Sequence, residues 1–88
     1  MNHRSAEHVA FGAAIRSLRA QRELTQEALA ERSQMDRTYL SGIERGVRNP
    51  SLTNILRIAT SLEVTPAELF VRAEGERAAR VDASSSPT

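Results

Sequence analysis

The sequence predicts an all-α domain built from five short helices. Apolar residues recur at helical spacing, as at Phe11, Ile15 and Leu18, which share one face of a helix. Residues that favour helix starts precede the apolar runs: Thr25, Ser51 and Thr65. Gly46 and Pro50 interrupt the pattern where a helix has to end. The chain has 88 residues, which leaves room for one small domain.

The folded domain is expected to span residues 9–72. Residues 1–8 are polar and should form a flexible N-terminus, after which the first helix runs to about residue 22. Residues 73–88 are rich in small, polar and serine residues, and we expect a disordered tail there.

The central stretch, residues 25–46, predicts two helices that meet at a tight turn. The first helix loses its apolar pattern near Gln34, and the second begins one or two residues later. Leu40 and Ile43 lie three positions apart and can share a buried face. Gly46 suits the left-handed residue that closes a helix. This arrangement is typical of a helix-turn-helix unit.

Two further helices follow the central stretch. The fourth should cover residues 52–62 and turn five apolar residues inward: Leu52, Ile55, Leu56, Ala59 and Leu62. The fifth is short and opens with a capping box, in which Thr65 and Glu68 bond each other's backbone amides. Leu69 and Phe70 are expected to close the core.

The outward face of the second central helix suits a DNA major groove. Arg37, Thr38 and Ser41 project away from the buried face, with Arg45 one turn further on. Arginine can donate two hydrogen bonds to guanine, while threonine and serine can bond base edges without filling the groove. The alternative is an ordinary surface helix whose polar face is solvated.

Composition excludes several classes of function. The chain lacks cysteine, and His3 and His8 have no acid-rich cluster beside them, so we expect no metal site, no cofactor and no enzyme. No apolar run is long enough to cross a membrane. Net charge is only +1, but residues 1–48 hold eight arginines against six acids. A nucleic-acid surface should therefore be local and lie in the first half of the chain.

Residues 11–70 resemble the phage repressor/Cro helix-turn-helix family, often called the XRE family. The resemblance rests on four motifs together: IRSLR, TQEALA, IERGVRNPS and TPAELF. The stretch MDRTYLSGIERGVRN is most similar to the controller proteins of restriction–modification systems. The resemblance implies a five-helix, lambda-repressor-like DNA-binding domain with the helix-turn-helix at helices two and three.

The resemblance also assigns roles to individual residues. Arg37, Thr38 and Ser41 match base-reading positions. Residues that match or adjoin the family's backbone-contacting positions are Gln26, Tyr39, Arg45, Arg48 and Asn49. Three alternatives stay open: Gln26 can be an ordinary exposed residue of a first helical turn, Tyr39 can be a half-buried tyrosine only, and Arg48 with Asn49 can simply shape a turn.

Arg19 and Glu44 match an ion pair that ties the first helix to the recognition helix. Two positions depart from the family pattern. Gln34 stands where the family often has glycine, so a left-handed backbone there would be strained. Gly42 stands where phage repressors can carry a base-reading side chain, which leaves more of the specificity to Arg37 and Thr38.

The absence of a membrane span and of a signal-peptide core predicts a cytoplasmic protein. The resemblance implies a homodimer that binds double-stranded DNA at a palindromic operator, represses or activates by position, and associates with the nucleoid when bound. A contact with RNA polymerase is a further option. The dimer contact should lie on the last two helices, where the candidates are Leu56, Val64, Leu69, Phe70 and Val71. The alternative is that all of them belong to the core, and for Leu56 and Leu69 the core is the favoured interpretation. The competing function is an antitoxin or protein-interaction module with the same fold, whose neutralising segment could only be the tail at residues 73–88.

Overall fold

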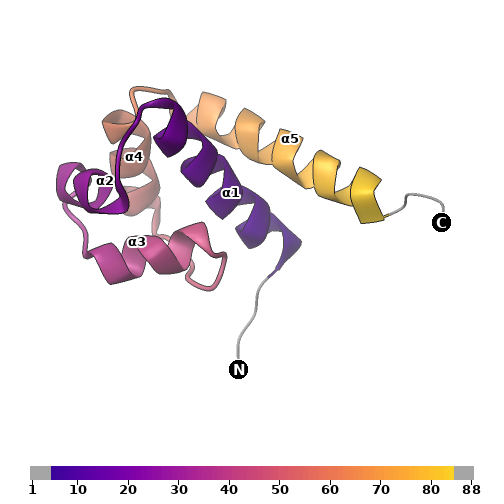
Figure 1. The fold of residues 1–88 in the computed structure, drawn as a ribbon, viewed down its shortest axis with the longest axis horizontal. Coiled ribbons are helices and arrows are strands. Elements are labelled where there is room, and N and C mark those ends of the chain that lie inside the picture. Colours follow the sequence, from indigo (N-terminus) through magenta and orange to yellow (C-terminus); the bar gives the residue numbers. More distant parts are fainter. Residues whose placement is uncertain (1–4, 85–88) are drawn as a thin grey trace.

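The computed structural model describes residues 5–84, with side chains as far as Val81, and this part of the chain consists of five helices and no strand (Figure 1). The helices are α1 (Ala6–Gln21), α2 (Gln26–Arg32), α3 (Arg37–Glu44), α4 (Leu52–Ser61) and α5 (Pro66–Ser84). The expected all-α, five-helix fold is therefore confirmed. His3 and the rest of residues 1–4 lie outside the described residues, as do residues 85–88.

Helix α1 is the centre of the domain. It packs along α5 on one side and against α3 on the other, while α2 packs on α3 and α4 (Figure 1). All of these helices contribute to one core, in which Ile15, Leu29, Leu40, Ile58 and Leu69 are fully buried. The α2–α3 pair is thus fixed to a rigid base formed by the other helices.

Helices α1 to α4 end in the same way, each with a residue at positive φ: Glu23, Gln34, Gly46 and Glu63. At the end of α2, the Met35 amide donates to the Ala30 carbonyl (2.9 Å) and the Gln34 amide donates to the Glu31 carbonyl (3.1 Å). This pair of bonds defines the Schellman motif, and it recurs at the other three ends. Gln34 does adopt the left-handed conformation at φ 57°, although it is not glycine.

Helix α5 is much longer than the sequence predicts. The expected disorder is wrong for residues 73–84, which continue the helix. Ala73 is buried in the core, and Arg72 reaches back to α1, where its Nη1 donates to Ser17 Oγ (2.9 Å). Arg77 also lies 3.6 Å from Glu7 of α1. Contacts with α1 therefore stabilise a segment whose composition alone favours disorder.

The start of α1 is also more ordered than expected. Ser5 is the N-cap, and its side chain accepts a hydrogen bond from the His8 amide (3.1 Å). Residues 5–8 therefore belong to a capped helix rather than to a flexible terminus.

The buried face of α4 differs from the expected one. Leu52 and Leu56 are 70% and 44% exposed, whereas Ile58 is fully buried. At about 100° per residue, Leu56 lies more than half a turn around the helix from Ile58. The prediction that Leu52 and Leu56 point inward is therefore wrong, and both leucines are available at the surface.

Candidate nucleic-acid interface

Asp36 fixes the start of the candidate recognition helix α3. Its carboxylate accepts hydrogen bonds from the Thr38 amide (2.9 Å) and the Tyr39 amide (3.3 Å). Met35, just before the cap, packs against the core that contains Leu40. These contacts make the first turn of α3 rigid. Asp36 is not among the predicted caps, although an aspartate before an apolar run is a recognised signal of a helix start.

The three candidate base-reading side chains lie on the outward side of α3. Arg37 and Thr38 are exposed and Ser41 is half-buried. Leu40 and Ile43, in contrast, are buried at 0% and 1% exposure. The helix therefore separates a core-facing side from a polar side, as the sequence predicts.

Arg37 has an acidic neighbour that the sequence did not indicate. Its Nε lies 3.1 Å from Glu27 Oε2 on α2, and the two side chains are 57% and 67% exposed. Solvent screens such a pair strongly, so Arg37 can leave Glu27 for a stronger acceptor at low cost.

Arg19 and Glu44 are brought together by the structure. Arg19 Nε donates to Glu44 Oε2 (2.8 Å) and Nη2 donates to Oε1 (3.1 Å), while Nη1 donates to the Leu24 carbonyl (2.9 Å). The Glu44 side chain is only 1% exposed. This bidentate pair joins α1 to the end of α3 and fixes the angle of α3 on the domain.

Gln26 belongs to the same network. The residue is half-buried, and its Nε2 donates to Glu44 Oε1 (3.0 Å). Glu44 thus receives donors from α1 and α2 at once. A phosphate contact by Gln26 would have to use the remaining N–H of its side chain.

The loop after α3 is held at Asn49. The half-buried Tyr39 donates its hydroxyl hydrogen bond to the Asn49 carbonyl (3.2 Å). His8 Nε2 lies 3.2 Å from Asn49 Oδ1, which can only accept a hydrogen bond. With Oδ1 on His8, the side-chain NH₂ group of Asn49 is the part of that side chain that can donate to DNA. No sequence signal links His8 to a residue 41 positions away.

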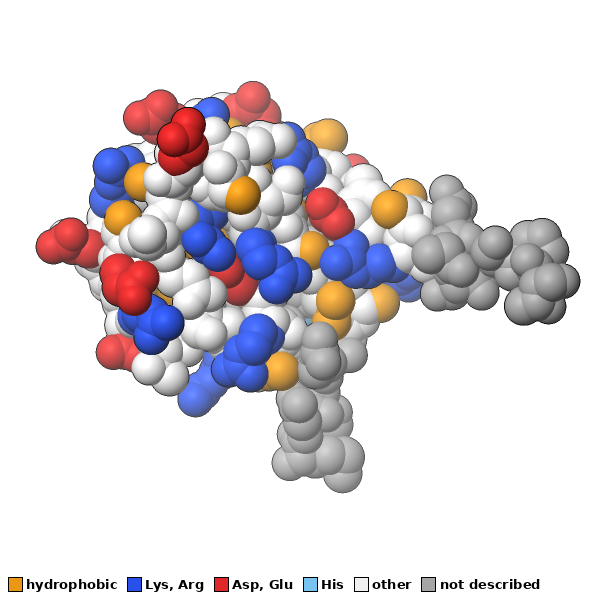
Figure 2. Space-filling model, in the orientation of Figure 1, with side chains coloured by type: hydrophobic (Ala, Val, Ile, Leu, Met, Phe, Trp, Pro, Cys, Tyr) orange, Lys and Arg blue, Asp and Glu red, His pale blue; other side chains and the backbone are white. Residues whose placement is uncertain are grey.

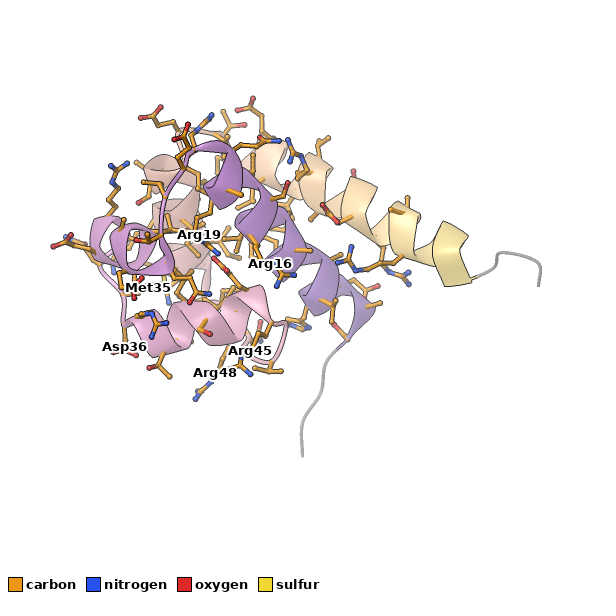
Figure 3. The ribbon with its side chains drawn as sticks, in the orientation of Figure 1. Arg16, Arg19, Met35, Asp36, Arg45 and Arg48 are labelled. Atoms are coloured by element: carbon orange, nitrogen blue, oxygen red, sulfur yellow. The ribbon has the colours of Figure 1, made fainter. Side chains whose placement is uncertain are left out.

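Basic side chains gather at the C-terminal end of α3. Figure 3 shows Arg45 and Arg48 pointing away from the domain beneath α3, with Asp36 at the opposite end of the helix from Arg45. Both arginines are exposed, and so is Arg16 on α1. Figure 2 shows arginine side chains spread across this face, with acidic side chains more towards the α2 end. The local basic surface expected for the first half of the chain is present.

Gly42 does not face outward from α3. It is buried, and the aliphatic stem of Arg48 lies over it, so this position offers no surface on which another side chain could read a base.

The five candidate dimer residues fall into two groups. Leu69 is fully buried, and Val64 is half-buried and packs on the core of its own chain. The core position favoured for Leu69 is therefore confirmed, and this residue is not available for a dimer surface. Exposed candidates remain at Leu56 (44%), Phe70 (46%) and Val71 (65%). The Phe70 ring packs on Phe11 with centroids 5.3 Å apart and borders an open groove of about 540 Å³ between α1 and α5.

Other kinds of site are not found in the part of the chain that the structure describes. Residues 5–81, whose side chains are described, contain no group of three metal-ligating side chains, and none of the described helices is long and apolar enough to cross a membrane.

This fold and this face define an all-α helix-turn-helix domain. The helix-turn-helix family profile matches residues 15–69, more than half of the chain, so the chain belongs to that family. The control protein C.MunI from Mycoplasma is 42% identical over 69 residues, which cover 77% of this chain and 93% of C.MunI.

Solved structures of similar proteins agree. The restriction–modification controller protein C.AhdI from Aeromonas hydrophila is 52% identical, with a TM-score of 0.74 over 75% of this chain and all of C.AhdI. The controller protein C.Esp1396I, solved as a tetramer with its natural 35 base-pair operator, is 36% identical, with a TM-score of 0.76 over 83% of this chain and 96% of its own. The resemblance to controller proteins is therefore confirmed.

Proposed function

We propose that this protein is a sequence-specific, DNA-binding transcriptional regulator that inserts α3 into the major groove of its operator. The observation that carries the proposal is the first turn of α3. There Arg37, Thr38 and Ser41 share the outward side of a helix that is capped by Asp36 and anchored by Leu40. A rigid helix end that presents one guanidinium and two hydroxyls suits direct reading of base edges.

Residues around α3 would hold the sugar-phosphate backbone. Arg45, Arg48 and Asn49 follow the C-terminal end of α3, where Gln26 also contacts Glu44, while Tyr39 lies in the first turn of α3. Such contacts set the register of the protein on the duplex without reading sequence. The Glu44 network and the bonds to Asn49 support these roles, because they fix both sides of α3 before DNA arrives.

The regulator would act as a homodimer on a two-fold symmetric operator. One short helix reads too few base pairs to select a site, whereas two copies about 34 Å apart can enter successive major grooves. Exposed Leu56, Phe70 and Val71 supply an apolar surface for the contact between copies. The assembly of C.Esp1396I on its operator supports a multimer of this kind.

The similarity to C.MunI and C.AhdI favours a role in controlling a restriction–modification system. The protein would then bind near a promoter, its own included, and repress or activate according to position. Activation would bring a contact with RNA polymerase. Within residues 5–84 no observation favours the antitoxin alternative, because residues 73–84 continue α5, which packs on α1 and approaches Glu7 through Arg77, rather than forming a separate segment.

Selection from a pool of random duplexes tests the proposal. We expect enrichment of a palindrome whose half-site centres are 10–10.5 base pairs apart or a multiple of this spacing. A variant with Arg37, Thr38 and Ser41 all changed to alanine should lose the enrichment. Arg80→Ala, on α5 far from α3, is the matched control and should retain it (Figure 1). Failure of the wild-type protein to enrich any sequence would reject the proposed function.

A further inference from the structure

Gly42 is a glycine inside a helix whose backbone does not require glycine. Gly46 is at positive φ, whereas Gly42 is not. Glycine weakens a helix interior relative to alanine, so a local reason is needed for its presence in α3. The reason is space rather than backbone conformation.

The space beside Gly42 is filled by Arg48. A Cβ built on Gly42 would overlap Cγ of Arg48 and would lie 3.3 Å from its Cβ and 3.5 Å from its Cδ. Two backbone bonds hold the loop in this place, because the amides of Val47 (2.9 Å) and Arg48 (3.2 Å) both donate to the Gly42 carbonyl. The loop therefore folds back on α3, and the stem of Arg48 lies across the helix.

We propose that Gly42 is a positioning residue, which places the Arg48 guanidinium at the outer edge of the recognition face for contact with one DNA phosphate. Figure 3 shows Arg48 extending outward from the domain beneath α3. An arginine on a free loop must be ordered when it binds, and a stem already seated on Gly42 avoids part of that entropy cost. This inference rests on the proposed DNA-binding function and assigns the residue that controls one of its backbone contacts.

Salt dependence of DNA binding tests the inference. Four proteins are compared on the selected duplex: wild type, Gly42→Ala, Arg48→Ala and the double variant. One lost phosphate contact lowers the slope of log K against log salt by about 0.9 per protomer, which corresponds to roughly eightfold weaker binding for each tenfold fall in salt below 1 M. We expect Gly42→Ala to show this loss, and the double variant to match Arg48→Ala.

Two results would overturn the inference. One is a Gly42→Ala protein that keeps the wild-type slope and affinity. The other is a double variant that loses the sum of both single effects. Arg48→Lys is the matched control: it keeps the stem and the charge, so Gly42→Ala should reduce its slope as in wild type.

Folding is followed by circular dichroism during heating. Should Gly42→Ala unfold, removal of the Arg48 stem in the double variant must restore a cooperative transition, because it removes the overlapping Cγ. A double variant that stays unfolded would show that Gly42 serves something other than Arg48. This thermal coupling requires no DNA. It therefore still reports on the packing if the wild-type protein selects no duplex and the proposed function fails.

Discussion

Two arginine–glutamate pairs in this protein differ in burial, and so they should differ in what they do. Arg19–Glu44 joins helices inside the domain, whereas Arg37–Glu27 lies at the surface. Removing one partner of a buried pair leaves an uncompensated charge, which costs far more than the loss of a screened pair.

Arg19→Ala should lower the free energy of unfolding by about 3–5 kcal/mol, because Glu44 would remain buried without its bidentate donor. A small domain has about 5–15 kcal/mol in total, so this loss is severe. Urea denaturation measures it. Arg37→Ala is the matched control and should cost less than about 1 kcal/mol. Equal losses in the two variants would contradict the structural role of Arg19.

Arg37→Ala should instead act on DNA recognition. Loss of a bidentate contact to a base should weaken binding to the selected duplex by about 1–3 kcal/mol and flatten the base preference at that position. Fluorescence anisotropy on a panel of single-base operator variants measures both effects. Unchanged preference across the panel would remove Arg37 from the base-reading role.

At the scale of the helices, local signals in the sequence predict most starts and ends. Thr25, Ser51 and Thr65 act as caps, because an N-cap depends on residues within one turn. The length of α5 could not be predicted in this way, since Arg72 bonds Ser17, 55 positions earlier. The candidate site also has a part that local sequence predicts and a part that it does not. The outward face of α3 follows from helical periodicity, whereas the positions of Gln26, His8 and Arg48 depend on tertiary contacts.

Non-glycine residues at positive φ offer a stabilising change. In Gln34→Gly the left-handed strain of about 1–2 kcal/mol is relieved, and part of the gain is offset by the greater freedom of glycine in the unfolded chain. We expect a net gain of about 0.5–1 kcal/mol in denaturant unfolding. Gln34→Ala keeps the Cβ and should show no such gain. A loss of stability in Gln34→Gly would mean that the side chain of Gln34 contributes more than its strain costs.

The capping box of α5 predicts a weak dependence of stability on acid. The Thr65 backbone amide, followed by its hydroxyl and the charge of Arg22, lowers the pKa of Glu68 below its ordinary value of 4.5. The folded pKa is the lower one, so this contribution is complete above pH 4.5 and is lost as the pH falls through the folded pKa. Glu68→Gln keeps the box and should flatten this part of a urea-midpoint profile. An unchanged profile would contradict the role of the carboxylate.

At the scale of the whole molecule, the exposed apolar residues bear on whether two copies of the chain associate. A domain of this size buries only about 60–65% of its unfolded surface, so a contact between copies would add stability. It would also supply a second copy of α3 for DNA binding. Phe70 is the candidate at which a role in a dimer contact is easiest to separate from a role in the core. It is 46% exposed yet packs on Phe11, so its outer edge is open while its inner edge supports the domain.

If the proposed dimer uses Phe70, Phe70→Asp should produce a monomer in sedimentation velocity while retaining the helical circular dichroism spectrum. A charge at the centre of an apolar contact between two copies would be repeated across the two-fold axis, which makes it doubly unfavourable. Affinity for the palindrome should fall, while affinity for an isolated half-site changes little, because α3 is untouched. Ala79→Asp introduces the same charge at an exposed position further along α5 and should remain dimeric. A Phe70→Asp protein that stays dimeric would remove Phe70 from the contact, whereas loss of the helical spectrum would show that its packing on Phe11 is needed for folding.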